Sequence, residues 1–192
     1  MKVVLFNGSP RNDGVTHKCL NIVMEELKSA GIEVDYNWIG MDKLQGCISC
    51  YKCAQNRDKK CAVKSDKLND YLEKMLGADG IILGSPTFFA DTSTRMKALI
   101  ERAGLVCKVN GDLLKHKAGA AVVAVRRAGA THVFSSLNYF FLINQMFVVG
   151  SSYWNLGLNP NVMNPEEFNK DEEGIQTFKN LGKNFAYLLE RL

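Results

Sequence analysis

Four of the chain's six cysteines lie close together, in the stretch CISCYKCAQNRDKKC at positions 47–61. The spacing Cys47-x2-Cys50-x2-Cys53 is the one by which a single loop places three thiolates around a cubane iron–sulfur cluster, and Cys61 is then available as the fourth ligand. No proline follows the last cysteine, so the segment is not the bacterial ferredoxin motif itself. The spacing therefore predicts a 4Fe–4S site held by Cys47, Cys50, Cys53 and Cys61.

Other uses of these thiols stay open. Zinc also favours four thiolates, although structural zinc sites usually consist of two Cys-x2–4-Cys pairs separated by a longer stretch. Disulfides formed on oxidation are a second alternative, and thiols without any metal are a third. We expect Cys19 and Cys107, which stand apart from the group, to be buried hydrophobic residues. Basic residues surround the group and would offset its negative charge or dock an acidic electron donor: Lys52, Arg57, Lys59, Lys60 and Lys64.

Composition and charge limit the class of protein. The chain has 192 residues and a net charge of +4, and its Lys and Arg residues are scattered, so we expect no nucleic-acid partner. No apolar run is long enough to cross a bilayer, and the short run after Lys2 lacks the length of a signal peptide. We therefore expect a cytoplasmic protein without a membrane partner. That compartment keeps thiols reduced, which favours metal or redox chemistry over structural disulfides.

The cysteine segment lies within an alternation of strand and helix patterns. Five apolar runs have the length of buried strands, at residues 2–7, 32–39, 80–85, 118–125 and 146–153. Apolar residues recur at helical spacing over about 16–30, 66–76, 94–103, 131–145 and 174–192. This order predicts one α/β domain over residues 1–192, with a parallel sheet and a Cys-rich loop at about 44–63. In such a sheet, ligands bind beyond the carboxyl ends of the strands.

The loop after the first expected strand has the composition of a phosphate site. It reads NGSPRNDGVT, and its amides, the hydroxyls of Ser9 and Thr16 and the first turn of the next helix can converge on one anion. Arg11 adds a charged donor. The loop has neither the Gly-Lys-Ser/Thr of a Walker loop nor the glycines of the dinucleotide fingerprint, which favours a monophosphate. The same residues would also serve an ordinary strand-to-helix turn.

The loop after the third expected strand, SPTFFADTST, combines aromatic rings with backbone groups. A flat heterocycle needs this combination, with Phe88 and Phe89 beside its faces and amides at its polar edge. The alternative is that both rings only cover the core. After the fourth expected strand, Arg126 and Arg127 are either donors to such a ring or solvated loop charges.

These two loops together resemble the NADPH-dependent FMN reductase group of flavodoxin-like proteins, through GSPRNDGVT and SPTFFADTSTRMKALIER. CISCYKC, followed by a fourth cysteine and CAVKSDKL, is more narrowly similar to the iron–sulfur flavoproteins within that group. The resemblance implies a flavodoxin-like three-layer α/β open sandwich with a five-stranded parallel sheet in the order 2-1-3-4-5. The chain departs from the group in the loop VRRAGATHVF, which has one glycine where relatives are usually glycine-rich.

The resemblance also implies FMN at the switch point and a homodimer or homotetramer. It implies that Ser9, Arg11, Gly14 and Thr16 hold the FMN phosphate and that Pro86, Thr87, Phe88 and Phe89 line the isoalloxazine ring. From the residues themselves we also expect Val15, Ala90 and Arg126 in the cofactor-binding set. The expected function is an FMN-dependent oxidoreductase, in which a 4Fe–4S cluster passes electrons between a ferredoxin-like protein donor and FMN. The alternatives are an NAD(P)H-dependent flavin, quinone or azo-compound reductase without a cluster, and a non-enzymatic redox carrier or sensor. No catalytic side chain is assigned, because the cofactor carries the chemistry.

Overall fold

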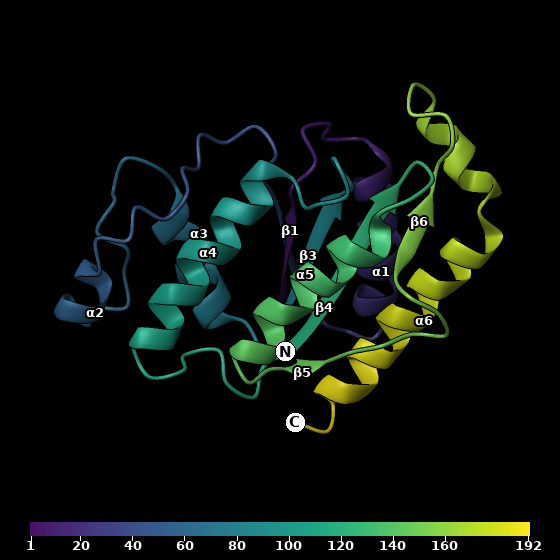
Figure 1. Cartoon of the computed structure of the whole chain (residues 1–192). Helices are drawn as coiled ribbons and strands as arrows, with labels where there is room; N and C mark the ends of the chain where they lie inside the picture. The colour runs from purple at the N-terminus through teal and green to yellow at the C-terminus, as the bar shows by residue number, and fades with distance from the viewer.

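A parallel β-sheet forms the middle layer of the computed structural model, which describes all residues from 1 to 192 (Figure 1). Its order is β2-β1-β3-β4-β5, every pairing is parallel, and a further short strand, β6, also pairs with β4. The flavodoxin-like order implied by the resemblance is confirmed. The strands are β1 (Lys2–Asn7), β2 (Glu33–Trp38), β3 (Gly80–Pro86), β4 (Ala118–Val125), β5 (Phe147–Val148) and β6 (Leu156–Leu158).

Helices cover both faces of the sheet because the side chains of the central strands alternate between two cores. In β1, Val3 and Leu5 pack with α1 and α6, whereas Val4 and Phe6 pack with α3, α4 and α5. A strand that is buried on both faces appears as a continuous apolar run, as KVVLFN does. No helix is long and apolar enough to cross a membrane. The helices are α1 (Val15–Ser29), α2 (Lys52–Asn56), α3 (Leu68–Gly77), α4 (Thr94–Val109), α5 (Ala130–Ile143), η1 (Pro165–Lys170) and α6 (Glu172–Leu189).

The fifth strand differs from its prediction. The sequence predicts one strand over 146–153, but β5 pairs only with the start of β4, and β6 pairs with its end. Between them, Asn155 donates from its side-chain Nδ2 to the carbonyl oxygen of Ala121 at 2.9 Å. Asn155 thereby satisfies a β4 carbonyl in the gap between the two short strands. An apolar run alone does not reveal such a break.

The segment between β2 and α3 projects beside α3 and α4, at the left of Figure 1, and carries the short helix α2. We call residues 44–63 of this segment the cysteine loop. Asn110, at the end of α4, donates from its Nδ2 to the carbonyl of Cys53 at 3.2 Å and accepts the backbone N–H of Lys59 at 3.1 Å. The cysteine loop is thus fastened to α4 although it has little regular structure.

Candidate functional site

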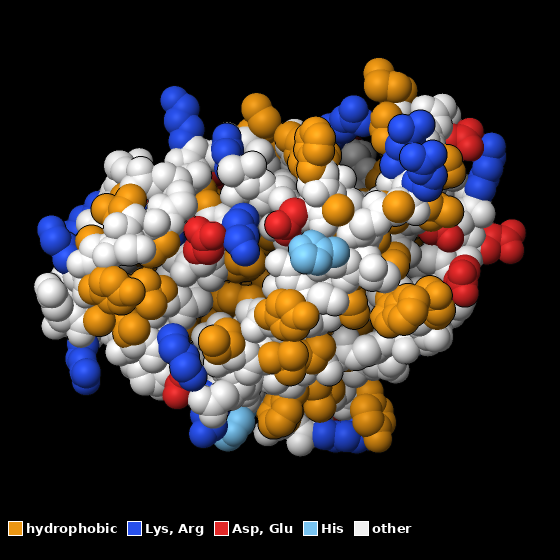
Figure 2. All heavy atoms as spheres, viewed as in Figure 1, with side chains coloured by type: hydrophobic (Ala, Val, Ile, Leu, Met, Phe, Trp, Pro, Cys, Tyr) orange, Lys and Arg blue, Asp and Glu red, His pale blue; other side chains and the backbone are white.

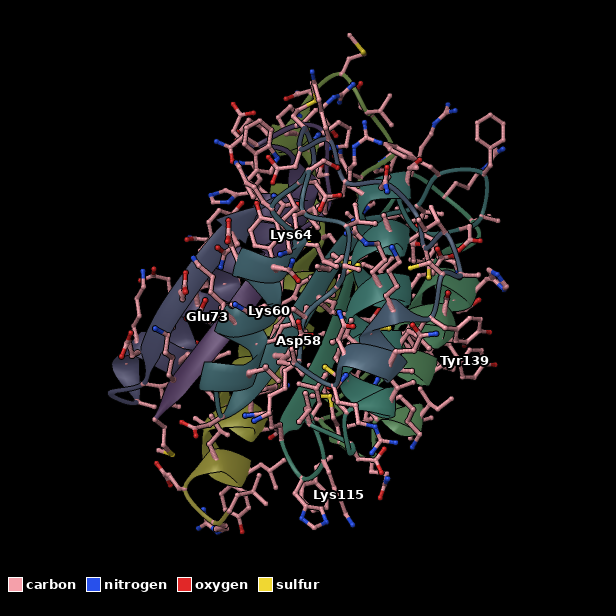
Figure 3. All side chains as sticks on the ribbon, turned by 90° about the vertical axis from the view of Figure 1, so that its left-hand side faces the viewer. Asp58, Lys60, Lys64, Glu73, Lys115 and Tyr139 are labelled. Atoms are coloured by element: carbon pink, nitrogen blue, oxygen red, sulfur yellow. The ribbon has the colours of Figure 1, made fainter.

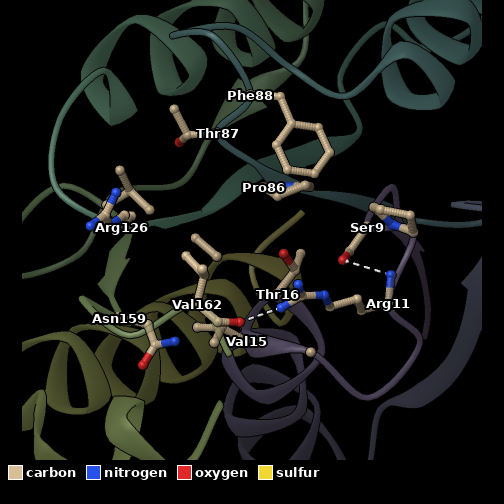
Figure 4. Close-up of a pocket in the computed structure, with 14 residues that line it drawn as sticks. Ser9, Arg11, Val15, Thr16, Pro86, Thr87, Phe88, Arg126, Asn159 and Val162 are labelled. Atoms are coloured by element: carbon tan, nitrogen blue, oxygen red, sulfur yellow. Dashed lines mark hydrogen bonds between the residues drawn. The ribbon is translucent and has the colours of Figure 1, made fainter. Parts of the chain in front are cut away.

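A cavity of about 370 Å³ opens where β1, β3 and β4 end (Figure 4). Its walls are the loops after β1 and β3, the end of β4 and the segment after β6. Open parallel sheets bind ligands at this position, because the strand order reverses between β1 and β3. The lining residues are Ser9, Pro10, Arg11, Gly14, Val15, Thr16, Pro86, Thr87, Phe88, Ala124, Val125, Arg126, Asn159 and Val162.

The cavity brings together all of the predicted cofactor-binding residues except Phe89 and Ala90. Those two form the tip of a tight turn in which Phe88 and Asp91 exchange backbone hydrogen bonds of 2.9 Å. Their φ angles are positive, 49° and 61°, as the central residues of a type I′ turn require. Phe89 is fully exposed. The turn thus holds Phe89 and Ala90 outside the lining of the cavity, and their contact with a ring stays a prediction.

The loop after β1 forms the polar wall of the cavity. Ser9 and Thr16 are buried. The Ser9 hydroxyl accepts the backbone N–H of Arg11 at 3.2 Å (Figure 4). Helix α1 begins with Gly14 as its N-cap, and it has neither a side-chain cap nor an acidic residue in its first turn. The N–H groups of that turn lack intrahelical acceptors and carry the positive end of the helix dipole, so this wall suits an anion.

Two residues at the end of β2 hold this loop in place, and neither was predicted from the sequence. Trp38 donates from its Nε1 to the Ser9 carbonyl oxygen at 2.7 Å. Gly40 passes so close that a Cβ there would lie 1.7 Å from the same oxygen. A glycine at the end of a strand pattern, as in WIG, is a known signal of such a close backbone approach.

The remaining cavity wall contains polar atoms without partners. Thr87 Oγ1 and Asn159 Oδ1 are both buried, and neither has a hydrogen-bond partner within the protein. Buried polar atoms are costly to leave unsatisfied, so these two are open to a polar group of a ligand. Phe88, which is about half exposed, adds an aromatic surface at the same cavity.

Two arginines hold the segment after β6 at the cavity. Arg11 donates from its guanidinium to the carbonyl of Val162 (Figure 4). Arg126 donates from its Nε to the carbonyl of Pro160 at 3.3 Å. Both loops that carry these arginines were predicted to belong to the site. The segment that they hold was not, because residues 159–162 have no pattern of their own that places them beside β1.

The four predicted metal ligands line a second, much smaller hollow of about 20 Å³. All four are free thiols. Apart from Arg102, the lining is hydrophobic. No three Cys, His, Asp or Glu side chains lie close enough together to hold a single metal ion. In a cubane each thiolate binds a different iron, so four thiols need not meet at one ion as they do at zinc, and a set of four thiols is compatible with a cluster. The hollow must widen to take a cubane.

The other two cysteines are buried, as predicted. Cys19 on α1 and Cys107 on α4 are both inaccessible to solvent. Burial raises the pKa of Cys107 to about 12. Burial also raises the pKa of Cys19 well above its ordinary value. Both side chains therefore stay neutral thiols, which are poor metal ligands.

Comparison with known proteins relates this geometry to a family. Residues 1–160 match the family model of NADPH-dependent FMN reductases. The chain belongs to this family. This FMN reductase family member is also 33% identical over 197 residues to an iron–sulfur flavoprotein of Methanocaldococcus jannaschii, with 99% of this chain and 98% of that protein covered. It is 32% identical over 192 residues to an iron–sulfur flavoprotein of Methanosarcina thermophila, with 99% and 96% covered.

Solved structures show that this FMN reductase family member has a flavodoxin-like fold. RosB with the bound intermediate 8-demethyl-8-formylriboflavin-5′-phosphate superposes with a TM-score of 0.77 at 20% identity, covering 100% of this chain and 80% of that one. A flavodoxin from the domain Archaea superposes with a TM-score of 0.64 at 16% identity, covering 99% of both chains. At these identities, the likeness concerns the fold and not the function.

Proposed function

We propose that this member of the NADPH-dependent FMN reductase family is an FMN-dependent oxidoreductase, built as one domain over residues 1–192. One observation carries the proposal. The switch-point cavity has the uncapped N-terminus of α1 at one wall and the unpartnered hydroxyl of Thr87 at another. The first wall suits a phosphate monoester, and the second suits the polar edge of a ring.

Different residues of the cavity are assigned to the phosphate and to the ring of the cofactor. We assign the phosphate to Ser9, Arg11, Gly14, Val15 and Thr16, in the loop after β1 and the first turn of α1. Because a guanidinium has five N–H donors, Arg11 can hold the Val162 carbonyl and still donate to a phosphate. We assign the ring to Pro86, Thr87 and Phe88, with Arg126 and Asn159 as polar contacts. FMN, when bound, supplies hydride and single-electron chemistry at this ring.

Mass spectrometry of the released cofactor tests the flavin assignment. We expect FMN, because the chain has one phosphate loop and no second glycine-rich fingerprint. Release of FAD, or purification and reconstitution without any flavin, would overturn the assignment.

We further propose that Cys47, Cys50, Cys53 and Cys61 hold a 4Fe–4S cluster, which supplies one-electron exchange with a protein donor. Their spacing and their convergence on one hollow support this assignment. The names of the relatives from Methanocaldococcus jannaschii and Methanosarcina thermophila support it as well. The basic side chains around the cysteine loop are exposed, and Figure 3 shows Lys60 and Lys64 on this side of the molecule. Such a surface suits an acidic protein donor of the ferredoxin type.

A second candidate function follows from the family's name, which specifies NADPH as the donor. In that case the protein is an NAD(P)H-dependent reductase, and the cysteines do not take part. Steady-state oxidation of NADPH and NADH, compared with reduction by a chemically reduced ferredoxin, separates the two. Turnover with NADPH that is unchanged in Cys61→Ala favours the second function, and reduction by ferredoxin that is lost in Cys61→Ala favours the first.

A further inference from the structure

Arg102, on α4, is the largest side chain that is fully buried in the molecule. It lies beneath the cysteine loop and lines the hollow that the four cysteines share. A buried guanidinium is costly unless partners compensate its charge. The flavin cavity does not include this residue. The position of Arg102 therefore needs an explanation of its own.

Arg102 fastens both ends of the cysteine loop. Its Nη1 donates to Asp66 Oδ2 at 2.5 Å and to the carbonyl of Gln45 at 3.2 Å. Its Nη2 donates to the carbonyl of Val63 at 3.2 Å and to Cys61 Sγ at 3.3 Å. The side chains of Arg102 and Asp66 are only 1% and 3% exposed. One guanidinium thus joins the two ends of the loop and touches the sulfur of one proposed ligand.

One donor of Arg102 remains free. Its Nε is buried and has no hydrogen-bond partner. Arg102 is also the one residue of the hollow's lining that carries a charge at neutral pH when the thiols are protonated. A guanidinium that lines the hollow and donates to Cys61 Sγ is complementary to an anionic sulfur, either a thiolate or a cluster sulfide.

Cys61 is held at its backbone as well as at its sulfur. Its N–H donates to Asn69 Oδ1 at 2.8 Å, and Asn69 donates from its Nδ2 to the Cys61 carbonyl at 3.0 Å. Asn69 lies on α3 and Arg102 on α4. Two regular helices therefore position Cys61, although Cys61 itself lies in an irregular loop.

We propose that Arg102 is a positioning residue that holds Cys61 toward the cluster and raises the cluster's reduction potential. This inference rests on the proposed 4Fe–4S site. Hydrogen bonds to the ligand sulfurs help to set the potential of such clusters, and an N–H donor to a ligand sulfur favours the more negative, reduced state. Asp66 compensates the charge of Arg102, so Arg102 should act on the potential through its N–H donor to Cys61 Sγ rather than through net charge.

The test compares variants of the anaerobically purified, FMN-loaded protein. R102M/D66N removes both charges, so that no uncompensated carboxylate stays buried. Asn110→Ala is the first control, because it removes the hydrogen bond to the Cys53 carbonyl without touching a sulfur. Lys64→Met is the second control, because it removes one positive charge from an exposed position beside the loop. The measurements are iron and FMN content, the rate of iron loss to a chelator, and the cluster midpoint potential.

We expect R102M/D66N to keep FMN, and to favour the oxidised cluster at least tenfold more than the unmodified protein does. For a one-electron couple, a tenfold change is a fall of about 59 mV in midpoint potential. Iron should also leave the variant several-fold faster. In both control variants, the equilibrium constant between oxidised and reduced cluster should stay within about threefold of its value in the unmodified protein. Solvent screens the charge of Lys64, and Asn110 contacts no sulfur.

Each other outcome has a definite meaning. If R102M/D66N keeps both the potential and the iron retention of the unmodified protein, the inference is wrong and the proposed function stands. If the unmodified protein takes up FMN but no iron after anaerobic reconstitution, the proposed cluster fails and the inference fails with it. If the double variant does not fold, Arg102→Lys decides instead. It keeps the charge but loses the fork that reaches Cys61, and an unchanged potential and iron retention would overturn the inference.

Discussion

Arg11 connects the two sides of the flavin cavity. Its backbone N–H donates to the Ser9 hydroxyl, and its guanidinium donates to the carbonyl of Val162. Its other donors remain available beside the first turn of α1, where the backbone already favours an anion. Phosphate binding and the placement of the segment after β6 thus depend on one side chain.

Replacing Arg11 with alanine should weaken FMN binding by about 1–3 kcal/mol, because a charged hydrogen bond to the phosphate is lost. Titration of the flavin-free protein with FMN, followed by flavin fluorescence, measures the change. Phe89→Ala is the matched control, since Phe89 lies at the exposed tip of a neighbouring loop and should leave the affinity unchanged. An unaltered affinity in Arg11→Ala would remove this residue from the site.

The groups of site residues that lie within one short stretch of sequence were the most predictable part of the candidate site. The cysteine set and the loop after β1 each lie within one short stretch, so composition alone indicated their chemistry. The position of Phe89 at the tip of its turn could not be predicted, because the conformation of the turn, and not the aromatic character of Phe89, decides where the residue lies. Asn159 and Arg102 were not predicted, because their roles depend on contacts between segments that lie far apart in the sequence.

At the level of elements, the end of β2 shapes the phosphate loop that follows β1. Trp38 and Gly40 both lie against the Ser9 carbonyl, one by a hydrogen bond and the other by close approach. The two strands are parallel neighbours, so their carboxyl ends meet at one edge of the sheet. This contact makes a residue outside the cavity a determinant of the cavity's shape.

Gly40→Ala should therefore lower the affinity for FMN at least tenfold, although residue 40 does not line the cavity. The added methyl group would overlap the Ser9 backbone, and a rigid backbone atom cannot move aside as the end of a flexible side chain can. Equilibrium binding of FMN to the variant measures the effect. Gly77→Ala is the control, since a Cβ there would meet nothing within 4 Å. Equal affinities in the two variants would show that the loop does not depend on Gly40.

Asp66, just before α3, links the stability of the cysteine loop to pH. Burial raises the pKa of Asp66, but hydrogen bonds from Arg102, Leu68 and Gln45 outweigh it and leave the pKa below its ordinary value of 3.8. A carboxyl whose pKa is lowered by folding stabilises the protein above its unfolded pKa. That contribution is lost as the pH falls through the folded pKa.

Asp66→Asn should lower the free energy of unfolding at pH 7 by about 3–5 kcal/mol, because it leaves the Arg102 guanidinium buried without its partner. The difference from the unmodified protein should shrink as the pH falls below 3.8. Urea unfolding at pH 7 and at low pH measures both effects. Asp58→Asn, at an exposed position of the same loop, should change stability little at either pH. A difference for Asp66→Asn that does not vary with pH would contradict the role of this carboxylate.

The order of the elements was predictable because strands buried on both faces leave continuous apolar runs, as in β1, β3 and β4. The early end of the fifth strand at Val148 was not. The predicted run 146–153 begins with four apolar residues, and the side-chain amide of Asn155, beyond the end of that run, satisfies the Ala121 carbonyl of β4. The short helix α2 within the cysteine loop was not predictable either, because it carries too few residues for a periodic signal.

At the scale of the whole molecule, the face formed by α5 and β5 is unusually apolar (Figure 2). Isolated exposed apolar residues are normal, but neighbouring ones mark surfaces of association. Helix α5 contains no Lys, Arg, Asp or Glu. The exposed apolar side chains on this face are Tyr139, Leu142, Ile143, Phe147 and Val148. This surface fits the expected homodimer or homotetramer.

We expect sedimentation velocity to show a dimer or larger assembly at micromolar concentration. Ile143→Glu places a charge within the apolar face. It should raise the dissociation constant of the assembly at least tenfold and so shift the protein toward monomer. Tyr187→Glu, at an exposed position of α6 in the opposite helical layer, is the control and should not alter the assembly. A monomer in the unmodified protein would contradict the expected assembly.

The central claim is that one chain holds both FMN and a 4Fe–4S cluster on separate parts of the fold. Its most direct test is the content of flavin, iron, sulfide and zinc per chain after anaerobic purification and reconstitution. We predict about one FMN, four iron and four sulfide per chain. Cys61→Ala should lose iron and keep FMN, whereas Cys19→Ala should keep both. Stoichiometric zinc in place of iron, or full FMN content with no metal after reconstitution with iron and sulfide, would contradict the claim.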